Sequence, residues 1–340
     1  MLRLRRAIVA VAGPADAVEQ RLAIQIGDER RTAIADIALV GPAEVGDEVV
    51  VNVEAVELGL GSGGADIVHV NLTRGLDGPG TPGAHVMKLN YTSLQHAVLP
   101  VEEGDADGIP TAPELPLGKP VAVIALHGQL APLAWAFHQA TGGKGRLGYV
   151  QTAGGALPGG HSCVAGELRA GGMLTGHLSA GPAFGGADGD AITTAAALHH
   201  GFTEMSWDAA VAGPGPGILG SGSALGHGGL QALDSAHTAL ALGCPTLLAP
   251  RMSSSDPRER HRGISHHTRT VLDLLLAPVV VALPDTESPG DARHEWKMIP
   301  TDLDGYTASG LPTRSMGRED PLFFAAALAS GTALAAAHTT

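Results

Sequence analysis

The stretch that decides the fold is Lys119–Gln129, which reads KPVAVIALHGQ. Its apolar run, Val121–Leu126, has the length and composition of a β-strand and ends at a histidine and a glycine. A helix is predicted directly after it, at about residues 130–140. The sequence at this point therefore changes to a rhythm of strand, loop and helix.

The same rhythm continues to the last third of the chain. This alternation predicts a doubly wound, mostly parallel, Rossmann-like α/β domain over residues 119–340. Beyond Pro284 we expect an irregular segment until a C-terminal helix near residues 320–337. The further predicted strands are Leu147–Gln151, Met173–Leu178, Ala209–Ala212, Thr246–Ala249 and Val279–Leu283, and the further helices lie at about 161–170, 189–200, 228–242 and 265–276.

Residues 1–100 have a different pattern of short apolar or alternating runs separated by glycine-containing turns. Regular spacing of this kind predicts a small antiparallel β-barrel or sandwich. The segment 101–118 is rich in acidic residues, glycine and proline, and we expect it to be a linker. The predicted strands of the first domain are Ala7–Ala12, Leu22–Ile26, Thr32–Ile37, Glu48–Val53 and Ile67–Asn71.

The composition limits the classes of partner. A formal net charge of −13 lacks the basic surface that nucleic acid or an anionic membrane requires. Two cysteines make no disulfide framework, which favours a reducing, cytoplasmic location. The alanine-rich stretch Pro321–Ala337 is short for a membrane span, and Asp320 before it predicts the start of a buried helix. A glycine- and alanine-rich chain with such a helix could form a homo-oligomer.

Unusual residues gather in the loops that follow strands, whereas the loops that follow helices are ordinary. His127 follows the first strand of the α/β domain, and His177 and Asp188 belong to the third. The fourth strand leads into Gly213–Gly229, and the fifth leads into Arg251–His267. Parallel sheets bind ligands outside the carboxyl ends of their strands, at a switch point of the topology. We therefore expect a binding site at that edge.

The loop after the fourth strand contains the pattern G-x-G-x-x-G at Gly215, Gly217 and Gly220. Its backbone N–H groups could hold an anion such as phosphate. Two prolines and a helix that starts only near Gly228 speak against a dinucleotide fingerprint. An anion-binding loop, a dinucleotide site and a merely tight structural turn remain three interpretations.

The segment Arg251–Thr270 is the sharper signal, with five arginines against two acidic residues. Ser265 is the predicted N-cap of a helix whose first turn holds two histidines, where cations oppose the helix dipole. A bound anion, or histidines kept neutral, would resolve this conflict. An anion clamp, an exposed basic loop and a metal site are the alternatives. The candidate anion-binding residues are Arg251, Arg258, Arg260 and Arg262; the candidate proton-transfer residues are His261, His266, His267 and His177; and the other expected pocket residues are His127, Asp188, Asp256 and Ser265.

Other nucleophiles and metal ligands have weaker signals. His177, Asp188 and His266 could hold a divalent metal or act as acid and base, but no H-E-x-x-H or C-x-x-C spacing is present. Cys163 begins a predicted helix, so it is either a reactive thiol or a small buried apolar residue. The loop serines have no nucleophile-elbow pattern around them, and we expect no serine hydrolase.

Several longer segments resemble an uncharacterised bacterial family, domain of unknown function 3866. The resemblance covers roughly residues 20–285, in both halves of the chain. It implies that the barrel and the α/β domain form one full-length unit, and it implies no substrate or mechanism. The segments that carry it are Glu57–Gly64, His85–Gln95, Thr175–His177 with Phe184–Gly186, Gly213–Gly222, Arg251–Ser253, Asp256–Arg258 and Arg260–Thr268.

Two functions from different classes follow from these residues. The first is an enzyme that acts on a phosphorylated or otherwise anionic small molecule, such as a phosphate-handling hydrolase or transferase. The second is a sensor or assembly module that binds a nucleotide or another anion without catalysis. The sequence names neither the substrate nor a cofactor, although a divalent metal is compatible with it.

Overall fold

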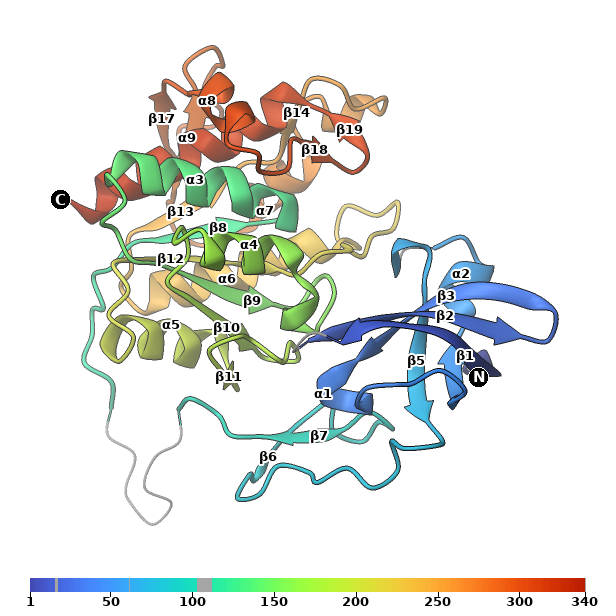
Figure 1. Ribbon diagram of the computed structural model, residues 1–340. Helices are drawn as coiled ribbons and strands as arrows, with labels where there is room; N and C mark the ends of the chain where they lie inside the picture. The colour runs from blue at the N-terminus through green and yellow to red at the C-terminus, as the bar shows by residue number, and fades with distance from the viewer. Residues whose placement is uncertain (16–17, 61, 103–111, 340) are drawn as a thin grey trace. The chain divides into compact units, whose positions relative to one another are not determined.

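The computed structural model describes residues 1–15, 18–60, 62–102 and 112–339. The chain divides into two compact units, Met1–Leu99 and Pro100–Thr340 (Figure 1). Residues 103–111, which make up much of the predicted linker, lie outside the described residues.

The first unit is a closed five-stranded barrel with strand order β1-β2-β3-β5-β4. Alternate residues such as Leu22, Ile24, Val49 and Val51 fill its interior, because successive side chains of a strand point to opposite faces. The predicted barrel is confirmed, but it is not wholly antiparallel, since β3 and β5 pair in parallel. Its elements are β1 (Leu4–Ala15), β2 (Glu19–Ile26), β3 (Glu29–Asp36), α1 (Ile37–Val40), β4 (Glu48–Asn52), α2 (Glu54–Glu57), η1 (Ser62–Gly64), β5 (Asp66–Asn71), and the hairpin β6 (Val86–Lys88) with β7 (His96–Val98).

The second unit is built on an eight-stranded sheet with the order β11-β10-β9-β12-β8-β13-β16-β17. All neighbouring strands in it run parallel. The central strands are buried along their whole length, which explains their continuous apolar runs. The strands are β8 (Val121–Ile124), β9 (Leu147–Thr152), β10 (Gly176–Ala180), β11 (Asp190–Ala191), β12 (Ala209–Pro214), β13 (Thr246–Ala249), β16 (Val280–Pro284) and β17 (Glu295–Ile299).

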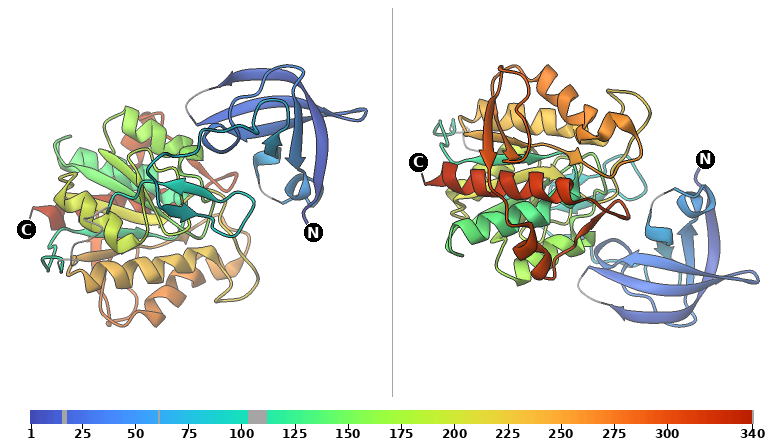
Figure 2. Two further views of the ribbon diagram at one scale, coloured as in Figure 1. Left: turned by 90° about the horizontal axis from the view of Figure 1, so that it is seen from below. Right: turned by 90° about the horizontal axis from the view of Figure 1, so that it is seen from above.

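Helices cover both faces of this sheet, which confirms the doubly wound fold. One apolar core joins the sheet to α3 (Leu130–Ala140), α4 (Cys163–Ala170) and α9 (Pro321–His338). A second core on the opposite face joins it to the helices α5 (Thr194–Thr203), α6 (Gln231–Ala241) and α7 (His266–Leu274). In the right-hand view of Figure 2, α9 and α3 lie on one side of the sheet, and α6 and α7 lie on the other.

The prediction of irregular chain beyond Pro284 is wrong. β17 pairs along its length with β16 at the edge of the sheet. Its sequence, EWKMI, has no apolar run because an edge strand keeps one side toward solvent. The predicted helix at 189–200 begins later, at Thr194, because β11 occupies its first residues. Short elements complete the unit: η2 (His127–Gln129), η3 (Gly159–His161), η4 (Gly228–Leu230), β14 (Met252–Ser253), η5 (Glu259–His261), β15 (Gly263–Ile264), α8 (Leu303–Ala308), β18 (Arg314–Ser315) and β19 (Arg318–Glu319).

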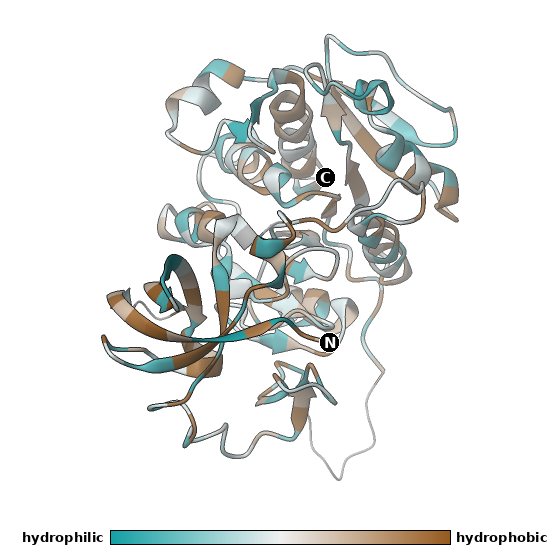
Figure 3. Cartoon of the chain, turned by 90° about the vertical axis from the view of Figure 1, so that its right-hand side faces the viewer, coloured by the Kyte–Doolittle hydropathy of each residue, from teal (hydrophilic) through white to brown (hydrophobic). Residues whose placement is uncertain are grey.

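Among the described helices, α9 alone is long and apolar enough to cross a membrane. Most of its residues, however, are buried against the sheet and α3. A side chain at Gly331 would lie only 2.1 Å from the backbone oxygen of Leu133, so the glycine allows α9 to approach α3 closely. Figure 3 shows the hydrophobic stretches of the strands and helices in brown. α9 is therefore a core helix of this unit.

The strand order creates a switch point at the carboxyl end of β8. From β8 the chain moves outward to β9, β10 and β11, returns to β12 between β9 and β8, and then continues to β13 on the other side. The loops after β8 and β9 lead to helices on one face, and those after β12 and β13 lead to the other. Loops that diverge in this way leave a crevice at the sheet edge.

Candidate functional site

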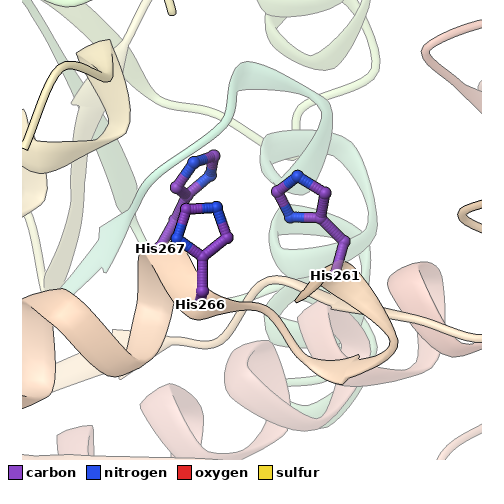
Figure 4. A group of neighbouring side chains, drawn as sticks. All are labelled: His261, His266 and His267. Atoms are coloured by element: carbon purple, nitrogen blue, oxygen red, sulfur yellow. The ribbon is translucent and has the colours of Figure 1, made fainter. Parts of the chain in front are cut away.

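The loop after β13 brings three histidines together. One ring nitrogen from each of His261, His266 and His267 lies within 4.8 Å of the others. Figure 4 shows the three side chains facing one another, His266 and His267 from the start of α7 and His261 from the preceding loop. The ring of His227, from the loop after β12, stacks on His267 with 3.5 Å between centroids. We call these four residues the histidine cluster.

Ser265 holds this arrangement in place as the N-cap of α7, as the sequence predicts. Its hydroxyl accepts a hydrogen bond from the backbone N–H of His267 and lies 2.8 Å from Nδ1 of His261. One buried side chain thereby fixes the beginning of the helix and the orientation of a histidine.

Asp256 organises the arginines of the same loop. Its carboxylate is fully buried and contacts the guanidinium groups of Arg251 at 3.4 Å, Arg258 at 3.0 Å and Arg318 at 3.0 Å. The hydrogen bonds from Arg258 hold the pKa of Asp256 well below its usual range. Arg262 donates to the backbone oxygen of Asp256. The antiparallel pair β14–β15 closes the loop that carries these residues. We call Asp256 and its four arginines the arginine group.

The arginine group has more guanidinium groups than carboxylates; Arg251 is buried, whereas Arg258 and Arg262 are exposed and Arg318 is half-buried. Three guanidinium groups contact one carboxylate, and the next carboxylate that acts on Arg251 belongs to Asp320. Asp320 is the N-cap residue of α9, as the sequence predicts, but its side chain accepts hydrogen bonds from Ser253 and from the backbone of Ser254 and makes none to the helix. Burial lowers the pKa of Arg251 to about 10, and its Nε has no partner among the described residues. Such a site favours an anion.

A contact between the arginine group and the histidine cluster determines the tautomer of His267. Nη1 of Arg251 lies 3.1 Å from Nδ1 of His267. Because a guanidinium can only donate, Nδ1 must accept, and the proton of neutral His267 is therefore on Nε2. The N–H donor of neutral His267 is therefore Nε2.

The four histidines are neutral at pH 7. Burial lowers the pKa of His227 and His261 to about 4 and also lowers that of His266, and the nearby arginines reinforce each shift. Burial and the neighbouring His227 lower the pKa of His267 further. Neutral rings remove the conflict between histidines in the first turn of α7 and the positive end of the helix dipole.

The donor set fits a metal ion less well than an anion. His261, His266 and His267 are the metal-compatible group found among the described residues. Histidine ligands normally donate their second N–H to a carboxylate, a carbonyl or water, whereas Nδ1 of His267 accepts a hydrogen bond from Arg251. A metal at Nε2 would have to displace the proton that this contact fixes, and it would lie beside cations.

Asp188 contacts His177 through the backbone of that residue. The carboxylate of Asp188 accepts a hydrogen bond from the backbone N–H of His177 at 2.8 Å and pairs with Arg169 at 2.7 Å. Neither residue belongs to the metal-compatible group in the described part of the chain. Burial lowers the pKa of His177 to about 3, so its ring is neutral.

The G-x-G-x-x-G loop packs against the loop after β9. A side chain at Gly215 would lie 2.4 Å from the backbone oxygen of Ala156, and Gly217 has a φ of +68°. The backbone N–H of Leu219 donates to Gly154. Close packing and a left-handed turn thus account for two of the three glycines, and Gly220 bridges to His227. Arg260 is exposed and acts on His266 only through its charge.

A second polar group lies where β8, β9 and β12 end. Nε2 of His127 is 2.8 Å from Oγ of Ser162, and its Nδ1 is 3.2 Å from the backbone oxygen of Pro214. The hydroxyl of Tyr149 donates to the same oxygen at 2.9 Å. Gln129 connects the two regions, because its side chain bonds both to the loop after β8 and to the backbone oxygens of Ala249 and Pro250.

Sequence reasoning missed several of these residues. Ser162 had a usable signal, since a serine between a strand-following loop and a helix is a common N-cap. Arg318 had none, because it reaches Asp256 from 62 residues away in the sequence. His227 lies in a long glycine-rich loop whose sequence does not place it, and Tyr149 is part of the apolar run of the predicted strand Leu147–Gln151.

Comparisons with known proteins give a family and no closer likeness. No curated protein and no solved structure matches the chain. The model of the family described as "Protein of unknown function (DUF3866)" matches residues 32–331, which is most of the chain. The resemblance seen in the sequence is confirmed, and the chain belongs to the DUF3866 family.

Proposed function

We propose that the chain is an enzyme acting on a phosphorylated or otherwise anionic small molecule, which binds between the histidine cluster and the arginine group. The observation that carries this proposal is the contact of Arg251 with Nδ1 of His267. It places an N–H donor on His267 next to the buried guanidinium of Arg251, whose Nε has no partner among the described residues, and such donors are what an oxyanion requires.

The surroundings add three further features that suit an anion. Arg251 and Arg318 each have a buried Nε without a partner among the described residues. The first turn of α7 contributes the positive end of a nine-residue helix. The buried Nε2 of His266 likewise has no partner there. Buried polar atoms without a partner are unusual in a folded protein, and their presence in both groups suggests a ligand.

Catalysis on such a ligand would divide between the two kinds of side chain. Arg251 and Arg258 would neutralise the charge of a phosphate or carboxylate, and His267 would donate a hydrogen bond to one of its oxygens. His261 and His266 are neutral and beside it, so either could move a proton to or from a leaving group. These roles fit a phosphate-handling hydrolase or transferase.

Calorimetric titration with inorganic phosphate, together with turnover of a phosphate monoester, tests the proposal. We expect binding by the wild-type protein and at least a tenfold weaker affinity in Arg251→Met, which keeps much of the side-chain volume. Arg146→Met is the matched control, because Arg146 directly precedes β9, at the opposite edge of the sheet, and its side chain donates to the backbone oxygens of Met205 and Ser206. Equal affinity in all three proteins would refute the proposal.

Two other outcomes would redirect it. Binding of phosphate or nucleotides without turnover of any phosphate ester would favour the non-catalytic sensor or assembly module. Stoichiometric zinc, manganese or iron in the purified protein, lost in His261→Gln, would favour a metal-dependent hydrolase instead.

We also propose a cytoplasmic location and no nucleic-acid partner; the two free cysteines and the acidic net charge support these assignments.

A further inference from the structure

Ser162 and His127 form a pair that the anion site does not use. His127 is the first residue of η2, which follows β8, and Ser162 is the N-cap of α4, which follows β9. Oγ of Ser162 lies 2.8 Å from Nε2 of His127. Ser162 is 4 % exposed and His127 is 9 % exposed. The pair lies at the switch point of the sheet, where ligands bind in parallel α/β folds.

The partners of His127 determine the direction of its hydrogen bonds. The backbone oxygen of Pro214 can only accept, and Tyr149 already donates its own proton to that oxygen. Nδ1 of His127 must therefore carry the proton, whether it donates to Pro214 or to the hydroxyl of Tyr149 at 3.3 Å. Nε2 is left with a lone pair, and Ser162 donates its hydroxyl proton to it.

This is the arrangement of a serine nucleophile with a histidine base. The base is oriented by a third group, here a backbone carbonyl, at hydrogen-bond distance on its other nitrogen. Burial keeps His127 neutral, with a pKa lowered to about 4. The base is therefore in its proton-accepting form across the neutral range.

The start of α4 supplies donors for a developing negative charge. Oγ of Ser162 accepts the backbone N–H of Ala165 at 3.0 Å. The N–H groups of Cys163 and Val164 belong to the first turn and have no intrahelical acceptor. Together with the helix dipole, they are the kind of donors that stabilise an oxyanion beside a nucleophile.

A buried N-cap bonded to a buried histidine would also form if the pair only stabilised the fold. In a buried region with a purely structural role, the polar groups normally all have hydrogen-bond partners. Here His177, which stacks on Tyr149 at 5.0 Å, has a buried Nε2 without a partner among the described residues. Oε1 of Gln151 and Oγ of Ser179, on the same two strands, are unpartnered as well. These orphaned groups indicate that the region accommodates a polar ligand.

We propose, against the expectation from the sequence, which considered only the loop serines, that Ser162 is a nucleophile activated by His127 and that the substrate is a carboxylic ester or thioester. Oγ forms a bond to the acyl carbon while its proton passes to Nε2 of His127, and the carbonyl oxygen becomes an oxyanion facing the start of α4. Collapse expels the alcohol or thiol, which takes the proton from Nε2 and leaves acyl-Ser162. Water then repeats the two steps, releasing the acid and restoring Ser162.

Labelling with a small fluorophosphonate, followed by peptide mass spectrometry, tests this assignment. Ser162 should displace fluoride and carry a stable phosphonyl adduct. Ser162→Asn should give no adduct, although asparagine keeps the N-cap and the fold. His127→Gln should slow labelling by about 100-fold or more, because the general base is lost. Ser221→Ala removes an exposed loop serine and should label as the wild type does.

The pH profile separates catalysis from a structural role. The labelling rate should stay flat from pH 9 to pH 6 and fall only as His127 becomes protonated, near pH 4. A folded wild-type protein without an adduct at Ser162 would overturn the proposal. So would an adduct whose rate is the same in His127→Gln. Phosphate titration of Ser162→Asn distinguishes the two proposals, because it reports the anion site independently of the label.

Discussion

His127 and His267 lie at the same edge of the sheet and hold opposite tautomers. Pro214 and Tyr149 require a proton on Nδ1 of His127, whereas Arg251 requires a lone pair on Nδ1 of His267. Nε2 is therefore a base in His127 and a donor in His267. The partner behind a histidine, rather than the histidine itself, sets its chemistry.

The two regions also differ in the charge of their surroundings. The pair of His127 and Ser162 contacts neutral groups beneath α3 and α4. His267 lies beside a buried guanidinium that Asp256 holds in place. A buried charge requires a partner, so the charged region depends on a carboxylate that the neutral region does not need.

The largest expected effect is therefore on stability, in Asp256→Ala. Removing a buried carboxylate leaves Arg251, Arg258 and Arg318 without their common partner, which should cost about 3–5 kcal/mol of unfolding free energy. Urea denaturation measures it. Glu259→Gln, in the same loop but exposed, should change stability by less than about 0.5 kcal/mol. Equal effects of the two would show that the arginine group is not organised by Asp256.

Acid should destabilise both regions. The pKa of His127 is about 4 in the folded chain and about 6.5 in the unfolded chain, so the unfolded state binds more protons between these values. The stability that neutral His127 provides is present above pH 6.5 and is lost as the pH falls through 4, with about 2 kcal/mol gone at pH 5. Denaturation at pH 7.5 and 5 measures this loss, and His127→Gln should reduce it. A loss unchanged in that variant would contradict a buried neutral His127.

Anion affinity should separate two substitutions of His267. His267→Phe removes the Nε2 donor and should weaken phosphate binding by about tenfold or more, since a hydrogen bond to a charged group contributes about 1.5–3 kcal/mol. His267→Gln retains an N–H donor and should weaken it less. Calorimetric titration measures both. If the two variants bind equally well, the donor role of His267 is wrong.

The smallest expected effect concerns the cap of α4. Ser162→Ala removes the acceptor for the N–H of Ala165 and should cost about 1 kcal/mol, whereas Ser162→Asn should cost a few tenths. Thermal denaturation of the two variants measures the difference. Equal costs would mean that the hydroxyl of Ser162 contributes to stability mainly through His127.

The sequence predicts much of the fold because its strands are continuous apolar runs. β13 was predicted with its observed bounds, and the edge strand β17 was missed because its residues are mostly polar. The gathering of Arg251, Asp256 and the histidines follows from the position of their loop after a strand. Their hydrogen bonds do not, because the contact of Arg318 with Asp256 and the tautomers of the histidines depend on tertiary packing.

Nitrogen-15 NMR of the imidazole rings tests the central claim most directly. Long-range proton–nitrogen correlations distinguish a protonated Nδ1 from a protonated Nε2, and His127→Gln and His267→Gln assign the two rings. At pH 7 we expect the Nδ1–H tautomer in His127 and the Nε2–H tautomer in His267. The same tautomer in both rings, or a positively charged His267, would contradict the assignment of a base to one region and an anion donor to the other.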